Sequence, residues 1–411
     1  MTIRLNGSDL TVTQVIAAAR HGEPVALAAE AITAMRQSRT VVEEVLSKSE
    51  PVYGLTTGVG ERKAFLLDPA QRQRFNHRLV LNHRIAQGDA APPDVVRGAM
   101  LCLASSYAKG VTGVRPELCE MIITLLNEGF ALVSSNAFTT AWACIATADA
   151  DVLMSVFDVA GALDLEAFGA NLTCLHPIIE QTRPFPGLAA TLGQLRALLA
   201  GSYLWQPGAA RFLQDPLTFR CIPHIHGAAR DALAYARRIL QLELNSSQSN
   251  PVVVVPERRI VSVGNFDIGP LAAALDFARI ALAPVVTITV EARTLAHPVS
   301  YELASSVKGE GIEDRATMAP LSARRLADMI QLCARVAAIE FVVAAQAIDL
   351  RERPGLTGAA PGQLGLGTGR AYRMIRELIP FTQGDGTLPA DLEPLVALVT
   401  TGNLNPPAAV A

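Results

Sequence analysis

Arg220 is the side chain of this sequence best suited to hold a small anion. It follows the turn residue Pro216 in the run Leu-Thr-Phe-Arg-Cys, whose apolar residues would exclude water from its head group. A guanidinium presents a planar fork of N–H donors, which can meet a carboxylate with two parallel hydrogen bonds. Arg220 could instead pair with Asp215 or with a helix end. The sequence therefore leaves two interpretations open, a carboxylate-binding arginine and a structural ion pair.

Two histidines follow shortly after this arginine, in the tetrapeptide Pro-His-Ile-His. Because His224 and His226 are two residues apart, they are poorly placed to share one face of a helix, and a metal site is disfavoured. A histidine is well matched to proton transfer near neutral pH. His224 is thus a candidate for acid–base chemistry, and we expect no metal.

A tyrosine in a glycine-rich segment is the third candidate. Residues 52–60, VYGLTTGVG, contain too much glycine and threonine for a helix. Glycine permits unusual backbone dihedrals and a close approach of backbone to ligand, so the segment is interpreted as a functional loop. Tyr53 could assist proton transfer there, or it could anchor the loop as a packing residue with a polar end.

Long helices must position these side chains. In the range 115–140, apolar residues recur at three- and four-residue steps over 118–126, Pro116 suits a first helical position and Gly129 can end the helix. Further alanine-rich stretches have helical spacing over 137–165, 188–204, 224–244, 267–297 and 320–349. Only 250–265, NPVVVVPERRIVSVGN, has the pattern of a β-hairpin.

These elements predict an all-α protein. Helices of such length favour a bundle of long antiparallel helices, and we expect it over about 133–411, with a smaller N-terminal helical domain over about 1–132. Faces rich in alanine and leucine on such helices predict burial between copies of the chain, and hence a homo-oligomer.

Composition narrows the functional classes. The chain has 411 residues, of which 50% are hydrophobic, 5% aromatic and 18% charged, with a net charge of −3. No basic block is present, so nucleic acid and anionic membranes are poor partners. The longest apolar runs fall short of a membrane span, and the N-terminus lacks the pattern of a signal or transit peptide. Six widely spaced cysteines without a CxxC pair are typical of a reduced, cytoplasmic protein.

Seven segments, in this order, resemble motifs of the aromatic amino-acid ammonia-lyases, above all the histidine ammonia-lyase branch. The resemblance extends over nearly the whole chain. The segments are VYGLTTGVG (52–60), LVLNH (79–83), AKGVTGVRPE (108–117), LQDPLTFRC (213–221), NPVVV (250–254), VGNFD (263–267) and GIEDRATMAP (311–320).

The resemblance implies a role for each matching residue. Tyr53 matches the loop tyrosine that assists proton transfer, and Arg220 matches the arginine that binds the substrate carboxylate. His83 and Glu313 match residues that face a polar ring in the histidine branch, which favours a substrate with a polar or basic ring. Two further residues match the amide and the aromatic ring that line the substrate cavity, or else serve as a turn residue and a core residue: Asn250 and Phe266.

Several positions depart from the family pattern. The tyrosine that acts as the principal base of the family is Leu217 here, and the glutamine before Glu313 is Ile312. The family has an asparagine after the segment that this chain lacks, and the matching residue here is Ser134. Ser134 lies in the polar patch Ser134-Ser135-Asn136. That patch could simply cap the next helix, and it could direct the backbone N–H groups of this helix at an anion. We keep Ser134 as a substrate-binding candidate, and His224 as the residue that replaces the missing base.

The family's Ala-Ser-Gly triad, which cyclises to the electrophilic methylideneimidazolone group, occurs nowhere in this chain. EGFALVSSN (128–136) resembles a family segment well downstream of the triad, so the electrophile loop is interpreted as excised. A second insertion of the family, between residues 277 and 297, is also absent. We therefore expect a protein without a cofactor, and a homotetramer as in the family or, given the excisions, a dimer.

Three functions remain open. The first is a prosthetic-group-independent lyase or isomerase that acts on a small ring-bearing carboxylate; ergothionase, which releases trimethylamine from a betaine, is a precedent in the superfamily. The second is a non-catalytic protein that binds such a ligand or a partner. The third is ordinary ammonia-lyase activity by another route, which is disfavoured because side chains alone supply a rate factor of only about 10²–10⁴.

Overall fold

The computed structural model describes residues 2–48, 50–58, 64–82, 90–128, 136–286, 295–298, 318–351, 363–383 and 391–404. The protein is all-α apart from two short strand pairs, as predicted. It divides into two compact units. Unit 1 comprises Met1–Ala146, Arg237–Leu275 and Pro298–Arg324, and unit 2 comprises Thr147–Ala236, Asp276–His297 and Arg325–Ala411. Where we expected a single boundary near residue 132, the chain instead enters unit 1 three times.

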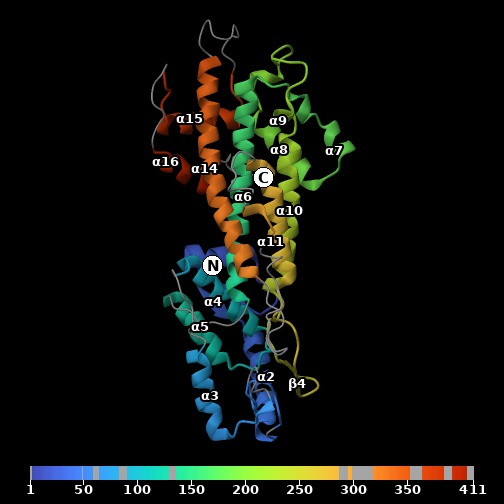
Figure 1. Cartoon of the computed structure of the whole chain (residues 1–411), viewed down its shortest axis with the longest axis vertical. Coiled ribbons are helices and arrows are strands. Elements are labelled where there is room, and N and C mark those ends of the chain that lie inside the picture. The colour runs from blue at the N-terminus through green and yellow to red at the C-terminus, as the bar shows by residue number, and fades with distance from the viewer. Residues whose placement is uncertain are drawn as a thin grey trace. The chain divides into compact units, whose positions relative to one another are not determined.

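Unit 1 is built on a group of three helices in which α4 contacts both α1 and α5 (Figure 1). The interior position of α4 explains why most of its side chains are buried; Leu101, for example, has no exposed surface. A short parallel pair of strands lies beside these helices. The elements are β1 (Ile3–Leu5), α1 (Val12–His21), β2 (Val25–Leu27), α2 (Ala29–Lys48), α3 (Pro69–Asn82), α4 (Pro93–Ala108) and α5 (Pro116–Glu128).

Local sequence signals set the ends of these helices. Thr11 and Gln14 form a capping box at the start of α1, and the helix ends at Gly22, whose φ of 69° favours glycine. Pro116 begins α5 and Glu117 lies in its first turn, as predicted.

The predicted β-hairpin is confirmed. β3 (Val252–Val254) pairs antiparallel with β4 (Arg259–Val261), so that Val253 lies opposite Ile260. Val253 is buried against Val41 and Val42 of α2, and Leu55 packs against the same cluster. This small core joins helix α2, the hairpin and the glycine-rich loop.

Unit 2 consists largely of long helices, and the axes of α6, α10 and α14 are nearly parallel (Figure 1). Some of these helices begin in unit 1. The elements are α6 (Ala137–Phe168), η2 (Leu172–Leu175), α7 (Ile178–Thr182), α8 (Pro186–Leu198), η3 (Tyr203–Trp205), α9 (Leu217–Arg220), α10 (Ile222–Leu244), α11 (Gly269–Leu282), η4 (Ala283–Val286), α14 (Ala319–Arg351), α15 (Leu366–Leu378) and α16 (Glu393–Thr400).

The apolar stripe of α14 faces the core of unit 2. Leu326, Met329 and Cys333 are each at most 1% exposed. These positions recur at three- and four-residue steps, which places them on one face of the helix. The opposite face carries Ile339 and Val343, which are more than half exposed.

A buried polar network joins three helices of unit 2. Asp158 of α6 is fully buried, and its Oδ2 accepts a hydrogen bond of 2.7 Å from Nη2 of Arg230. Its Oδ1 lies 2.9 Å from Nδ1 of His226 and 3.1 Å from Nη1 of Arg230. Nη1 of Arg230 also donates to the Thr191 hydroxyl of α8 at 2.9 Å. The buried carboxylate is therefore fully paired, as buried charges must be.

The cysteines are unpaired, and one apolar helix departs from the expectation that the apolar runs fall short of a membrane span. All six cysteines are free. One stretch, Gly269–Val286, is long and apolar enough to cross a membrane, and 56% of it is buried inside the chain. Burial of this kind is typical of the core helix of a globular protein.

Candidate functional site

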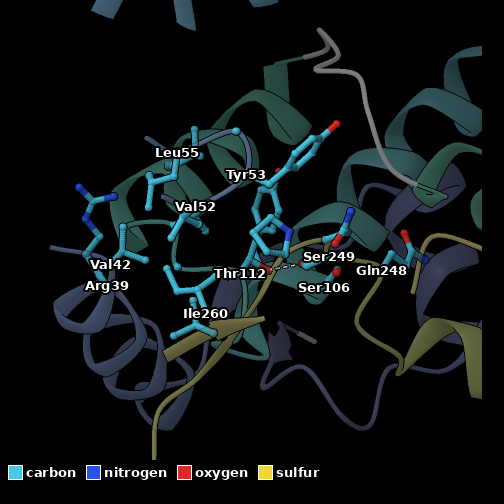
Figure 2. Close-up of a pocket in the computed structure, with 18 of the residues that line it drawn as sticks. Arg39, Val42, Val52, Tyr53, Leu55, Ser106, Thr112, Gln248, Ser249 and Ile260 are labelled. Atoms are coloured by element: carbon cyan, nitrogen blue, oxygen red, sulfur yellow. Dashed lines mark hydrogen bonds between the residues drawn. The ribbon is translucent and has the colours of Figure 1, made fainter. Parts of the chain in front are cut away.

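A cavity of about 920 Å³ lies in unit 1, between the glycine-rich loop, α2, α4, the start of α5 and the hairpin (Figure 2). Its walls combine apolar side chains with amides and hydroxyls. Oγ of Ser249 lies 2.7 Å from that of Thr112, and this hydrogen bond joins two segments of the wall (Figure 2). A cavity that is mostly apolar with a few oriented polar groups suits a small organic ligand.

The glycine-rich loop places Tyr53 in the wall of this cavity. Thr56 is fully buried, and its hydroxyl accepts from the amide of Val52 at 2.8 Å and donates to the carbonyl of Glu50 at 2.5 Å. Gly54 has a φ of 70°, which a side chain would disfavour. Tyr53 is thus carried by a tightly held turn, as a loop with a functional side chain requires.

Asn250 and Phe266 line the same cavity, as the family resemblance implied. Phe266 is 54% exposed, so it is not a core residue. Asn250 has a structural contact as well, because its Oδ1 accepts from the amide of Val263 at 2.8 Å. Both expected alternatives for Asn250 therefore coexist, the turn residue and the cavity residue.

The sequence marks Asn136 only as part of a possible helix cap and does not single out Gln248 or Glu243, yet these three residues form a polar group at the cavity. Asn136 and Gln248 line the cavity. Nδ2 of Asn136 donates to the carbonyl of Phe266 at 3.0 Å, and Nε2 of Gln248 donates to Oε1 of Glu243 at 2.9 Å. Burial raises the pKa of Glu243, whereas hydrogen bonds from the two amides lower it. The carboxyl of Glu243 thus fixes two amides of the wall.

A second, smaller cavity of about 320 Å³ lies in unit 2 and contains Arg220 and His224. Arg220 ends the short helix α9, and its Nε donates to the backbone carbonyl of Asp215 at 2.8 Å. One expected alternative was an ion pair between Arg220 and the carboxylate of Asp215. The described contact is instead with the main-chain carbonyl of Asp215. The Nη atoms of Arg220 have no hydrogen bond to the described residues, so the end of the guanidinium fork remains open to a ligand.

Two further atoms of the smaller cavity lack hydrogen-bond partners among the described residues: Oδ1 of Asp215 and Nδ1 of His224. Asp215 is only 3% exposed, and its other oxygen accepts from the amide of Asn171 at 2.6 Å. Unpaired buried polar atoms are costly unless a ligand or water pairs with them. The smaller cavity is therefore a polar binding pocket.

The imidazole of His224 is expected to be neutral at pH 7. Burial lowers its pKa below the ordinary value, and the positive charge of Arg183 lowers it further. A neutral imidazole is the form that accepts a proton, which is what the expected base must do.

We predict that the pKa of His224 lies below about 6.5, the ordinary value for histidine. The ring C–H signals of the folded protein, followed by NMR from pH 8 to pH 5, measure this, and the spectrum of His224→Gln assigns the signal. An inflection above a pH of about 6.5 would contradict this, because it would show that the negative charge of a nearby acidic group raises the pKa of His224.

The structure brings the predicted residues together in two groups. Tyr53, Asn250 and Phe266 line the cavity of unit 1, and Arg220 and His224 line that of unit 2. Three other candidates lie outside the described residues: His83, Ser134 and Glu313.

His226 has a structural contact in the core of unit 2. It is 7% exposed, and its Nδ1 lies 2.9 Å from the buried carboxylate of Asp158. In the part of the chain that the structure describes, no group of three or more His, Cys, Asp or Glu side chains could hold a metal ion.

Comparison with known proteins decides the family. A model of the family described as "Aromatic amino acid lyase" matches residues 10–130, 126–290 and 284–377. The chain belongs to the aromatic amino acid lyase family. It is 28% identical over 500 residues to histidine ammonia-lyase of Symbiobacterium thermophilum, across 97% of this chain and 96% of that protein. It is also 28% identical over 484 residues to histidine ammonia-lyase of Streptococcus gordonii, across 93% and 92%.

Solved structures of the family have the same fold. Ergothionase of Treponema denticola, an ergothioneine-degrading enzyme in complex with desmethyl-ergothioneine sulfonic acid, superposes with a TM-score of 0.90 at 23% identity, over 98% of this chain and 99% of that chain. Histidine ammonia-lyase of Trypanosoma cruzi gives 0.83 at 21% identity, over 98% and 94%. At these identities the similarity shows the fold alone.

The family match consists of three overlapping pieces, which share residues 126–130 and 284–290. The alignment with the first relative extends over 500 positions, more than the 411 residues of this chain, so it contains gaps within the chain. Helix α5 ends at Glu128 and α6 begins at Ala137, and the residues between them, GFALVSSN, contain no Ala-Ser-Gly. The residues of this chain therefore do not fit the methylideneimidazolone group, which is built from that triad.

Proposed function

We propose that this chain is a lyase- or isomerase-type enzyme that works without the methylideneimidazolone group, on a small ring-bearing carboxylate. The observation that carries this proposal is the contrast between the two halves of the family's site. Tyr53, Asn250, Phe266 and Arg220 occupy cavity walls, whereas the triad that would supply the electrophile is missing.

The missing electrophile limits the reaction. The group turns a poor amine leaving group into a good one, or acidifies an unactivated C–H bond. Acid–base catalysis by side chains contributes only about 10²–10⁴ in rate. The substrate must therefore bring its own activation, either as a good leaving group, such as the trimethylammonium of a betaine, or as a C–H bond that is already acidic. Elimination, isomerisation and cyclisation of such a substrate are all within reach of side chains.

Each residue has a role in this proposal. The open end of the Arg220 fork binds the substrate carboxylate, and Tyr53 lies over the substrate and assists proton transfer. His224, neutral at pH 7, takes the proton that the missing family tyrosine would have taken. Asn250 and Phe266 shape the cavity around the ring, and the polar side of the ring is met by His83, Ser134 and Glu313.

We propose that the complete site forms between copies of the chain, since we expect the protein to be a homo-oligomer. The cavity that contains Tyr53 in one copy would meet the pocket that contains Arg220 in another. Exposed apolar side chains on the long helices of unit 2 support association, since 50% of Phe277 and 60% of Val343 is exposed. A tetramer is the family arrangement, and a dimer is the alternative.

We predict that the purified protein is a tetramer or a dimer at micromolar concentration, because contiguous apolar faces on the helices would otherwise meet water. Multi-angle light scattering measures the mass directly. A monomer of 43.6 kDa over the whole concentration range would contradict both assemblies.

The proposal that copies of the chain share a site can be tested with two variants, each of which removes one residue from one half of that site. Tyr53→Ala and Arg220→Ala, purified separately, should both bind urocanate and cinnamate weakly. If each site takes one half from each of two copies, hetero-oligomers obtained by co-expression with two different tags should regain a fraction of sites with the affinity of the unmodified protein. Hetero-oligomers that bind as weakly as the two parents would show that the halves are not shared.

Catalysis itself is tested by hydrogen exchange. The protein is incubated in D₂O with imidazole and phenyl propanoates and with their trimethylammonium betaines, and NMR follows loss of C–H signal or release of trimethylamine. The proposal predicts turnover of at least one compound and its loss in His224→Gln.

The missing Ala-Ser-Gly triad also supports a second candidate, a non-catalytic ligand-binding protein. If these compounds bind but none of them exchanges hydrogen or releases trimethylamine, the result would support this alternative and contradict the proposed enzymatic activity.

A further inference from the structure

The cavity of unit 1 contains positive charge that its described walls do not neutralise. Arg39 and Arg115 both line it, and no aspartate or glutamate is among its described lining residues. Glu243 lies behind the wall, where it is engaged by the amides of Asn136 and Gln248. An anion that enters the cavity would therefore meet cations and amide donors before it meets a carboxylate.

The two arginines differ in their availability. Nε of Arg39 donates to Oε1 of Glu43 at 2.9 Å, one turn further along α2. This contact partly satisfies Arg39, although a pair as exposed as this one stabilises little. Arg115 is exposed, and its guanidinium has no ion pair or hydrogen bond with any residue that the structure describes; its backbone carbonyl accepts from the amide of Leu118 at 3.1 Å. Arg115 is thus the available cation of the cavity.

Arg115 directly precedes the first residue of α5 and lines the cavity. Leu118, three residues later, lines the same cavity, as expected for two residues on one face of a helical turn. Glu117 and Glu120 are exposed and do not line it. The acidic residues of the first turns of α5 therefore point elsewhere, and no acidic side chain among the described residues of the wall pairs with Arg115.

The rest of the cavity suits a ring. Tyr53, Tyr107 and Phe266 contribute aromatic surface, and Val253 and Ile260 of the hairpin add apolar surface. Flat aromatic side chains provide a large contact area for a planar ligand. An anionic group carried by such a ring would come within reach of the walls that hold the two arginines.

We propose that the substrate is a ring-bearing dianion, with its second anionic group bound by Arg115 in the cavity of unit 1. This inference rests on the proposed function, in which Arg220 binds the first carboxylate. Arg115 would then determine whether the site prefers substrates with one anionic group or with two.

Two matched probes test the assignment: cinnamate, with one carboxylate, and 4-carboxycinnamate, which adds a second carboxylate to the ring. Isothermal titration should show that the unmodified protein binds 4-carboxycinnamate about five- to tenfold more tightly, the size expected for one accessible charge pair, at about 1.4 kcal/mol per tenfold. Arg115→Gln should abolish this preference and leave the affinity for cinnamate unchanged. Arg115→Lys should retain part of it, because the charge remains.

Arg36→Gln is the matched control, because Arg36 is an exposed residue of α2 that does not line the cavity. It removes the same charge and should leave the preference intact. The preference should also shrink as salt is raised, since screening weakens an exposed charge pair.

The outcomes separate the two proposals. Equal binding of both probes by the unmodified protein overturns the dianion inference and leaves the proposed function standing. A preference that survives in Arg115→Gln also overturns it. Failure to bind either probe overturns the proposed function together with this inference.

Discussion

Replacing Arg220 with alanine should weaken the binding of ring-bearing carboxylates about 10- to 100-fold, at about 1.4 kcal/mol per decade. Its Nε is already engaged by the carbonyl of Asp215 at 2.8 Å, which orients the fork and leaves the Nη atoms for the ligand. Charge-assisted hydrogen bonds of this kind are worth about 1.5–3 kcal/mol. Isothermal titration with urocanate and cinnamate measures the loss.

Two further variants identify the cause. Arg220→Lys should restore binding only in part, because a point charge replaces a bidentate fork. Arg211→Ala removes an exposed arginine of the same unit that does not line the pocket, and it should not change the affinity. Arg220→Ala could instead lower the melting temperature and leave the affinity for urocanate and cinnamate unchanged. That result would show that Arg220 is structural and would favour the non-catalytic function.

The second large effect concerns stability. Asp158→Asn should lower the free energy of unfolding by roughly 3–5 kcal/mol, the usual cost of breaking a buried charge pair. Asp158 is fully buried, and the substitution leaves Arg230 without the carboxylate that holds its Nη2 at 2.7 Å. Urea and thermal unfolding measure the change.

The control is the same substitution at an exposed position. Asp68 accepts a hydrogen bond from the amide of Gln71 at 2.8 Å, just before α3. Asparagine can make the same bond, so Asp68→Asn should be nearly neutral. Equal midpoints for the two variants would mean that the Asp158 network does not stabilise unit 2.

Much of the fold could be predicted because local patterns determine it. The helical stripe of α14 contains residues that are buried in the structure, and the alternating run before and after residues 255–258 forms the hairpin. These features depend on contacts between residues close in sequence, or on the periodicity of one face. The return of residues 237–275 to unit 1 depends on packing between distant segments, and a single boundary near 132 did not anticipate it.

The site was predictable only where motifs mark it. Tyr53, Asn250, Phe266 and Arg220 were found by resemblance, and each lies in a cavity wall. The contact of Asn136 with Phe266 was not foreseen, because it joins residues 130 positions apart and neither residue type signals the other.

The buried carboxyl of Glu243 was missed for the same reason. In the sequence it looks like one more polar residue of a long amphipathic helix. Only the fold places it beside the amides of Asn136 and Gln248.

The central claim, that this member of the family works without the methylideneimidazolone group, is tested most directly with L-histidine. The protein is incubated with histidine, and the appearance of urocanate is followed by its ultraviolet absorbance. The account predicts no urocanate above the buffer control, because no Ala-Ser-Gly is present to form the electrophile that ammonia loss requires. Steady formation of urocanate in proportion to the amount of protein would contradict it.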